Sequence, residues 1–147
     1  MIRKAREEDA SRIAEILIFT KRMNYRSIFH DDIGSFVGLQ VYPLAKEYLD
    51  HPEQLENIWV YDDGFAKGML HAENGRIVEL YVDTFFENNG IGSKLIEFAI
   101  KELNCRSLWV LEKNTNAIRF YERHGFRQTA EKTLEQGTTE MLLKMSI

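Results

Sequence analysis

The sequence predicts an α/β (α+β) fold built on a mixed, mostly antiparallel sheet of about six or seven strands. Two observations predict it. Residues 57–82 hold successive strand-like segments joined by short turns, a pattern typical of an antiparallel meander. The strand-like segments 76–82 and 107–111 are separated by a helical stretch, and crossovers of that kind join parallel strands. We therefore expect one parallel pair in the middle of the sheet.

Composition sets the broad class. The chain has 147 residues, 44% of them apolar and 29% charged, with a net charge of -4. This length predicts a single domain, 1–147, and the negative charge argues against a nucleic-acid partner. With no long apolar run and no apolar leader, we expect no membrane association and a cytoplasmic location. The single cysteine, Cys105, excludes an internal disulfide and a cysteine-rich zinc site, so no metal is expected.

The N-terminal region begins with a predicted strand at residues 2–5. Three acids at 7–9 then favour a helix start, because the positive end of the helix dipole lies there. Apolar residues follow from Ala10 at helical spacing, and we expect this helix to end near residues 23–24.

The region 24–57 predicts one or two short helices. Pro43 suits the first turn of a helix, and Pro52 should stop it. Within this region His30-Asp31-Asp32 is a polar helix start, a group that binds a cationic acceptor, or a set of metal ligands, although no further ligands lie at metal spacing.

The remaining elements follow a clear order. We expect strands at 57–61, 65–72 and 76–82, a helix at 90–103, a strand at 107–111, a helix at 117–124 and strands at 127–133 and 138–145. Asn74-Gly75 is a strong hairpin signal, and Gly125 suits the position after a helix end.

The segment 87–93, Glu-Asn-Asn-Gly-Ile-Gly-Ser, lies between a predicted strand and a predicted helix. A helix start carries unpaired N–H groups and partial positive charge, and glycine lets a ligand approach the backbone. This arrangement suits a phosphate or pyrophosphate. The segment matches neither a Walker loop nor a dinucleotide loop, and it is alternatively a helix start that needed flexible residues.

Two segments resemble the GNAT superfamily of N-acetyltransferases. Residues 87–92 resemble its Q/R-x-x-G-x-G/A loop, and residues 114–126 resemble its N-x-x-A-x-x-x-Y-x-x-x-G-F segment. The resemblance is specific over 76–126, where the two motifs occur in order. It implies that the central parallel strands splay apart and that helices cover both faces of the sheet, as in acyl-CoA N-acyltransferases.

The resemblance also implies acetyl-CoA as the acyl donor and a primary amine as the acceptor. Main-chain amides of 89–93 would hold the pyrophosphate, and strand 79–82 would pair with the pantetheine arm. The cofactor-binding residues implied are Leu80, Tyr81, Val82, Glu87, Asn88, Asn89, Gly90, Ile91, Gly92, Ser93 and Asn114. Glu87 departs from the usual Gln or Arg, so either Lys94 or Lys113, or mostly the backbone amides, are expected to neutralise the phosphates.

Amine acetylation requires a neutral amine and a protonated leaving group. Glu79 is the candidate general base, acting through water, and is alternatively a solvated or paired strand acid. A main-chain N–H near Leu80 or Tyr81 could stabilise the charge on the thioester oxygen. Tyr121 corresponds to the family tyrosine near the thioester sulfur, where it would protonate the thiolate, and is alternatively a core residue.

The leading hypothesis is an acetyl-CoA-dependent N-acetyltransferase that acts on a small-molecule amine by direct attack in a ternary complex. A protein or peptide N-acetyltransferase and a non-catalytic acyl-CoA sensor are the alternatives. The region 20–57 carries four basic and six acidic residues, which favours a basic amine but is equally explained by solvation. We expect a monomer or a homodimer.

Overall fold

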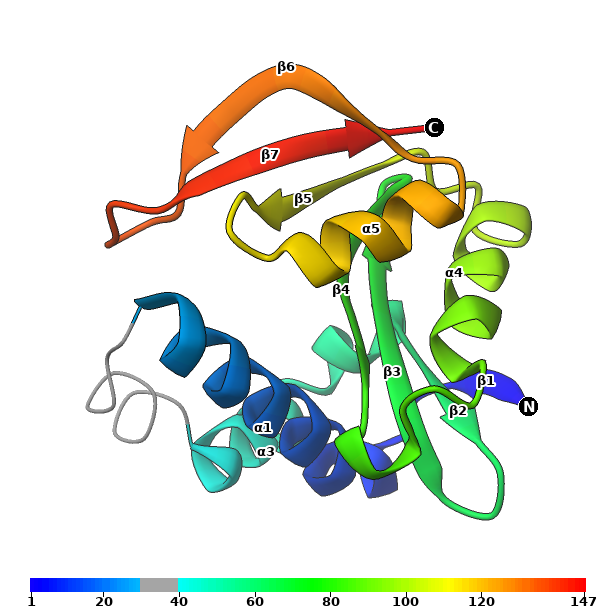
Figure 1. The fold of residues 1–147 in the computed structure, drawn as a ribbon. Coiled ribbons are helices and arrows are strands. Elements are labelled where there is room, and N and C mark those ends of the chain that lie inside the picture. The colour runs from blue at the N-terminus through cyan, green and yellow to red at the C-terminus, as the bar shows by residue number, and fades with distance from the viewer. Residues whose placement is uncertain (30–39) are drawn as a thin grey trace.

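The computed structural model describes residues 1–29 and 40–147, and Figure 1 shows the arrangement. The described part of the chain contains one seven-stranded sheet in the order β1-β2-β3-β4-β5-β7-β6. The strands are β1 Ile2–Lys4, β2 Ile58–Asp62, β3 Ala66–Glu73, β4 Arg76–Val82, β5 Ser107–Leu111, β6 Arg127–Leu134 and β7 Met141–Ser146. Neighbouring strands are antiparallel except β4 and β5, which are parallel. The predicted fold class is confirmed.

Helices cover both faces of this sheet. They are α1 Ala10–Phe29, α3 Val41–Asp50, α4 Ile91–Lys101 and α5 Thr115–Arg123, with 3-10 turns at Glu7–Asp9, Pro52–Asn57 and Thr84–Phe86. Side chains alternate across β3, so Met69 joins the apolar cluster under α1 and α3, whereas Leu70 joins the cluster under α4 and α5. None of the helices in the described ranges is long and apolar enough to cross a membrane.

The prediction that the first helix ends near residues 23–24 was wrong. Helix α1 continues from residues 23–24 to Phe29, because no Gly or Pro interrupts the chain there and most of its residues tolerate a helix even where the apolar pattern stops. Helix α3 contains Pro43 in its first turn and ends before Pro52, as predicted. The segment His30-Asp31-Asp32 lies outside the described residues.

The central parallel pair splays apart as the resemblance implied. Only Arg76–Ser107 and Ile77–Leu108 are paired between β4 and β5. Directly afterwards β4 carries one extra residue, Val78, since His71 of β3 pairs with Glu79 and Ala72 pairs with Ile77. Such a bulge increases local twist, which turns β4 away from β5 and leaves a gap between the two strands.

Candidate active site

A cleft of about 890 Å³ occupies the gap between β4 and β5. Its walls come from α1, β4, the loop before α4, the first turn of α4, β5, α5 and β7. Of the residues predicted to bind the cofactor, those that line the cleft are Leu80, Tyr81, Val82, Glu87, Asn88, Gly90, Ile91, Gly92, Ser93 and Asn114. Asn89 is the exception, because its side-chain amide donates to the carbonyls of Phe86 and Glu87, each at 3.2 Å, and so braces the loop.

The start of α4 presents unpaired donors to this cleft. The first hydrogen bond within the helix runs from Lys94 N–H to the Gly90 carbonyl at 3.1 Å, so the amides of residues 91–93 have no partner inside the helix. Gly90 adopts a φ of +78°, which glycine reaches without strain. A Cβ on Gly92 would lie 3.4 Å from the ring of Phe120, in ordinary van der Waals contact, so the first turn of α4 packs directly against α5. These features fit a diphosphate.

The cations of the cleft differ from the expected ones. Lys94 lies 3.4 Å from the Tyr61 hydroxyl, and Lys113 pairs with Glu140 at 2.9 Å, and neither lines the cleft. Arg119 and Arg123 line it instead. Their i,i+4 spacing on α5 was the signal in the sequence, but nothing there showed that this face of α5 turns toward the glycine loop.

Ser93 has a partner that the sequence did not indicate. Its hydroxyl lies 3.1 Å from Nε2 of His124, at the end of α5. Burial lowers the pKa of His124, whose ring packs against Phe120 with the centroids 4.9 Å apart. The neutral imidazole therefore fixes the Ser93 side chain in the first turn of α4.

Tyr121 lines the same cleft from α5. Its ring packs edge-on against Phe126 and Phe120, with centroids 6.0 and 5.3 Å away. Burial raises the pKa of Tyr121 to about 12, so the phenol keeps its proton throughout the neutral range. Among the described residues its hydroxyl has no hydrogen-bond partner, which leaves the proton available to a ligand. The ring packs in the core, as the alternative interpretation held, and the side chain also faces the cleft.

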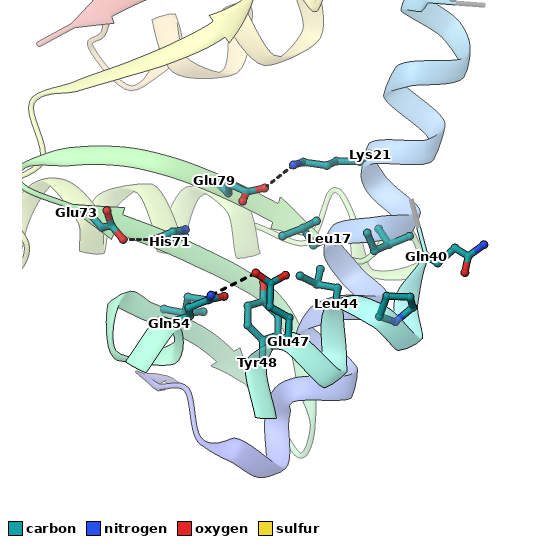
Figure 2. A pocket seen from close by; sticks show the side chains of 13 residues that line it. Leu17, Lys21, Gln40, Leu44, Glu47, Tyr48, Gln54, His71, Glu73 and Glu79 are labelled. Carbon is teal, nitrogen blue, oxygen red and sulfur yellow. Dashed lines mark hydrogen bonds and ion pairs between the residues drawn. The ribbon is translucent and has the colours of Figure 1, made fainter. Parts of the chain in front are cut away.

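A second cavity, of about 620 Å³, lies between the α1–α3 pair and strands β3 and β4 (Figure 2). Among the residues that the structure describes, three carboxylates, Glu47, Glu73 and Glu79, line it with one lysine, Lys21. The charge of its lining is therefore negative. Tyr48 also lines this cavity, and its pKa is raised by burial and by the nearby charges of Glu79 and Glu47.

Glu79 stands where the two cavities meet. It lines both of them, and its side chain is 18% exposed. Lys21 Nζ lies 3.4 Å from Glu79 Oε2, at ion-pair range, and no residue in the described ranges donates a hydrogen bond to that oxygen. Glu79 is therefore paired rather than solvated, and its side chain faces both cavities.

His71 adds a second titratable group to this wall. It is the cross-strand partner of Glu79, and cross-strand side chains share one face of the sheet. Its Nε2 lies 2.8 Å from Glu73 Oε1, where the imidazole must donate because an ionised carboxylate only accepts. This hydrogen bond lowers the pKa of Glu73. The i,i+2 spacing of His71 and Glu73 on one strand was the signal in the sequence.

No group of His, Cys, Asp or Glu in the described ranges could hold a metal ion. Cys105 is a free, buried thiol, and burial raises its pKa. This thiol is therefore unsuited to act as a nucleophile.

Comparison with known proteins agrees with this geometry. Residues 54–128 match the family model described as an acetyltransferase (GNAT) domain, which spans about half of the chain and includes both predicted motifs. The chain belongs to the GNAT acetyltransferase family. It is an acetyl-CoA-dependent N-acetyltransferase, and the predicted family and co-substrate are confirmed.

Relatives within GNAT act on different acceptors. The chain is 25% identical to the peptidyl-lysine N-acetyltransferase YjaB of Salmonella typhimurium, over 91% of this chain and 88% of that one. It is 27% identical to the spermine/spermidine N(1)-acetyltransferase of Bacillus subtilis, over 67% of this chain and 57% of the relative.

Solved GNAT structures share the fold. An N-acetyltransferase from Staphylococcus aureus Mu50 superposes with a TM-score of 0.76 at 16% identity, over the whole of both chains. The Salmonella typhimurium protein yncA, solved with acetyl-CoA, superposes with a TM-score of 0.67 at 20% identity, over all of this chain and 92% of that one.

Proposed function

We propose that this protein transfers acetyl from acetyl-CoA to the primary amine of a small cationic molecule, by direct attack in a ternary complex. The cleft between β4 and β5 holds the CoA, and the cavity beside α1 and α3 holds the amine. The observation that carries the proposal is that Glu79 lines both cavities. Because both halves of the chain contribute to the site, we take residues 1–147 as one catalytic domain.

The cofactor side is built from main-chain donors and two arginines. The unpaired amides at the start of α4 would bind the pyrophosphate, which the helix dipole also favours. Arg119 and Arg123 would supply the positive charge that Glu87 does not. The edge of β4 at 79–82 faces the cleft and would hold the pantetheine arm, with Asn114 and Tyr121 on the opposite wall.

On the amine side, Glu79 would remove the proton that keeps the acceptor unreactive. A primary amine with a pKa of about 10.4 is neutral in roughly one molecule of 2,500 at pH 7, a deficit of about 4–5 kcal/mol. Partial burial of the carboxylate and the apolar side chains around it favour the neutral amine over the ammonium ion. The hydrogen-bonded pair of His71 and Glu73 leads from this point toward solvent and offers the proton a way out.

Tyr121 would stabilise the departing thiolate. Its pKa of about 12 is well above that of a thiol, about 8.5, so the phenol enters the reaction protonated. A hydrogen bond from this phenol lowers the energy of the negative sulfur as the bond to the acetyl carbon breaks. The sulfur then takes up the proton of the Tyr121 hydroxyl, and the phenolate regains a proton that the amine nitrogen releases as the amide forms.

The lining of the second cavity favours a small cationic acceptor. Three carboxylates face one lysine there, and a cavity of about 620 Å³ is sufficient for a short amine. The Bacillus subtilis relative acts on spermine and spermidine by its name, which supports this choice. The second candidate is a lysine side chain of a protein or peptide, which the name of the Salmonella relative and its coverage of the chain favour.

An acceptor panel tests the proposal. Initial rates of CoA release would be compared for butane-1,4-diamine, n-butylamine and a lysine peptide with a blocked N-terminus. We expect the diamine to give the highest kcat/KM, because its second ammonium meets a carboxylate of the cavity. A peptide that exceeds both amines would establish the second candidate, and no turnover with any of the three would contradict the proposal.

A further inference from the structure

Lys21 of α1 places an amine of the chain itself at the meeting point of the two cavities. Lys21 and Glu79 are the residues that the two cavity linings share within the described ranges. Lys21 Nζ lies 3.4 Å from Glu79 Oε2, and the lysine side chain is 26% exposed (Figure 2). A primary amine of the protein therefore stands beside the carboxylate to which we assign deprotonation of the substrate.

This position meets the requirements for an acetyl acceptor. The amine must face the cofactor cleft, and Lys21 lines it. It must also have a proton acceptor within reach, and Glu79 Oε2 accepts no hydrogen bond from any residue that the structure describes. The four-carbon stem of lysine is flexible enough to adjust the position of Nζ. Lys46, in contrast, is 59% exposed on α3 and pairs with Asp50 at 2.6 Å.

We propose that Lys21 is an intramolecular acetyl acceptor, which becomes acetylated when acetyl-CoA is bound and no substrate amine fills the second cavity. The inference rests on the proposed function. Glu79 takes one proton from the ammonium and passes it to solvent. The Nζ lone pair then forms a bond to the acetyl carbonyl carbon, the carbon–sulfur bond breaks, and CoA leaves as a thiol with the second proton. The product is a neutral amide.

Acetylation of Lys21 has a consequence for the site. The amide carries no charge, so the ion pair with Glu79 is lost. The acetyl group then occupies the junction through which the substrate amine must reach the thioester. Protein acetylated at Lys21 is therefore expected to acetylate amines more slowly. Acetylation of Lys21 would thus inhibit the enzyme when the concentration of the acceptor amine is low.

The test uses the whole chain and mass spectrometry. The purified protein is incubated with acetyl-CoA alone, and the gain of acetyl groups is followed on the intact protein and mapped to peptides, with Lys46 as the internal reference. We expect Lys21 to react at least about ten-fold faster than Lys46, because it is held beside both reactants. The rate constant should not change with protein concentration. Glu79→Gln should slow Lys21 and leave Lys46 unchanged, and Lys21→Arg should remove the fast site.

Two results would overturn the inference: a rate constant at Lys21 no greater than that at Lys46, or a first-order rate constant at Lys21 that rises in proportion to protein concentration. A parallel sample with butane-1,4-diamine separates this failure from failure of the proposed function. If the diamine is acetylated in that sample while Lys21 stays unmodified in the sample with acetyl-CoA alone, the proposed function stands and the inference about Lys21 fails. When neither the diamine nor Lys21 is acetylated, the proposed function itself has failed.

Discussion

The substitution Glu79→Gln tests the general base most sharply. Glutamine keeps the shape of the side chain and the neighbouring Lys21, but it cannot accept a proton from the acceptor amine. Glu79 is the carboxylate that lines both cavities, so no other acid in the described ranges is placed to replace it.

The expected loss of activity follows from the protonation of the acceptor amine. At pH 7 the neutral fraction of a primary amine represents about 4–5 kcal/mol, and a positioned base typically contributes about 10²–10⁴-fold. Glu79 is only 18% exposed and its Oε2 lacks a hydrogen bond, so we expect an effect near the middle of that range, about 10³-fold in kcat/KM at pH 7. The ratio of wild-type to variant kcat/KM should fall about ten-fold for each unit by which the pH rises, because the neutral amine becomes more abundant.

The assay follows CoA thiol release with a chromogenic disulfide between about pH 6.5 and 9.5. The only cysteine of the chain, Cys105, is buried and should not contribute to the signal. Glu131→Gln serves as the matched control, since that carboxylate lies on β6 and pairs with Lys144. A Glu79→Gln rate within about three-fold of wild type over this range would refute the assignment.

Three further substitutions probe other parts of the account. Tyr121→Phe should lower kcat about 100-fold, with the CoA dissociation constant unchanged in calorimetry. Because the pKa of Tyr121 is about 12, the wild-type enzyme should lose no activity through ionisation of Tyr121 below about pH 10. Gly92→Val should raise the CoA dissociation constant about ten-fold, because a Cβ there would already contact the Phe120 ring at 3.4 Å and the two methyl groups beyond it would crowd α5 or the cleft. Asp9→Asn should lower the free energy of unfolding at pH 7 by about 3 kcal/mol in urea titrations, because the buried Asp9 carboxylate accepts hydrogen bonds from Arg3 at 2.8 and 2.9 Å. Those bonds lower the pKa of Asp9, so the stability that Asp9 contributes is present above about pH 4 and is lost as the pH falls through the folded-state pKa. The variant should not show this loss of stability in acid.

Local patterns account for the parts of the fold that the sequence predicts well. The strands at 76–82 and 107–111 have the predicted bounds, because alternating side chains and turn residues act over a few positions. The start of α4 was also predictable, since Gly90 and Gly92 mark a helix entrance that leaves donors unpaired. Together with the resemblance to GNAT, these local signals predict residues that line the cleft between β4 and β5.

The acceptor side depends on contacts between distant residues, which a single sequence does not reveal. Lys21 and Glu79 meet only because α1 packs against β4. The pairing of Ser93 with His124 likewise requires α4 and α5 to lie together. The bulge at Val78, which turns β4 away from β5, arises from the pairing of β4 with β3. No glycine at this position of the sequence indicates it.

A crystal structure of the protein with CoA and butane-1,4-diamine tests the central claim most directly. The account predicts the pyrophosphate on the amides of residues 91–93 and the sulfur near Tyr121. It also predicts one diamine nitrogen between Glu79 and the sulfur, with the remainder of the diamine in the second cavity. A diamine bound away from Glu79, or a sulfur that does not reach the junction of the two cavities, would contradict it.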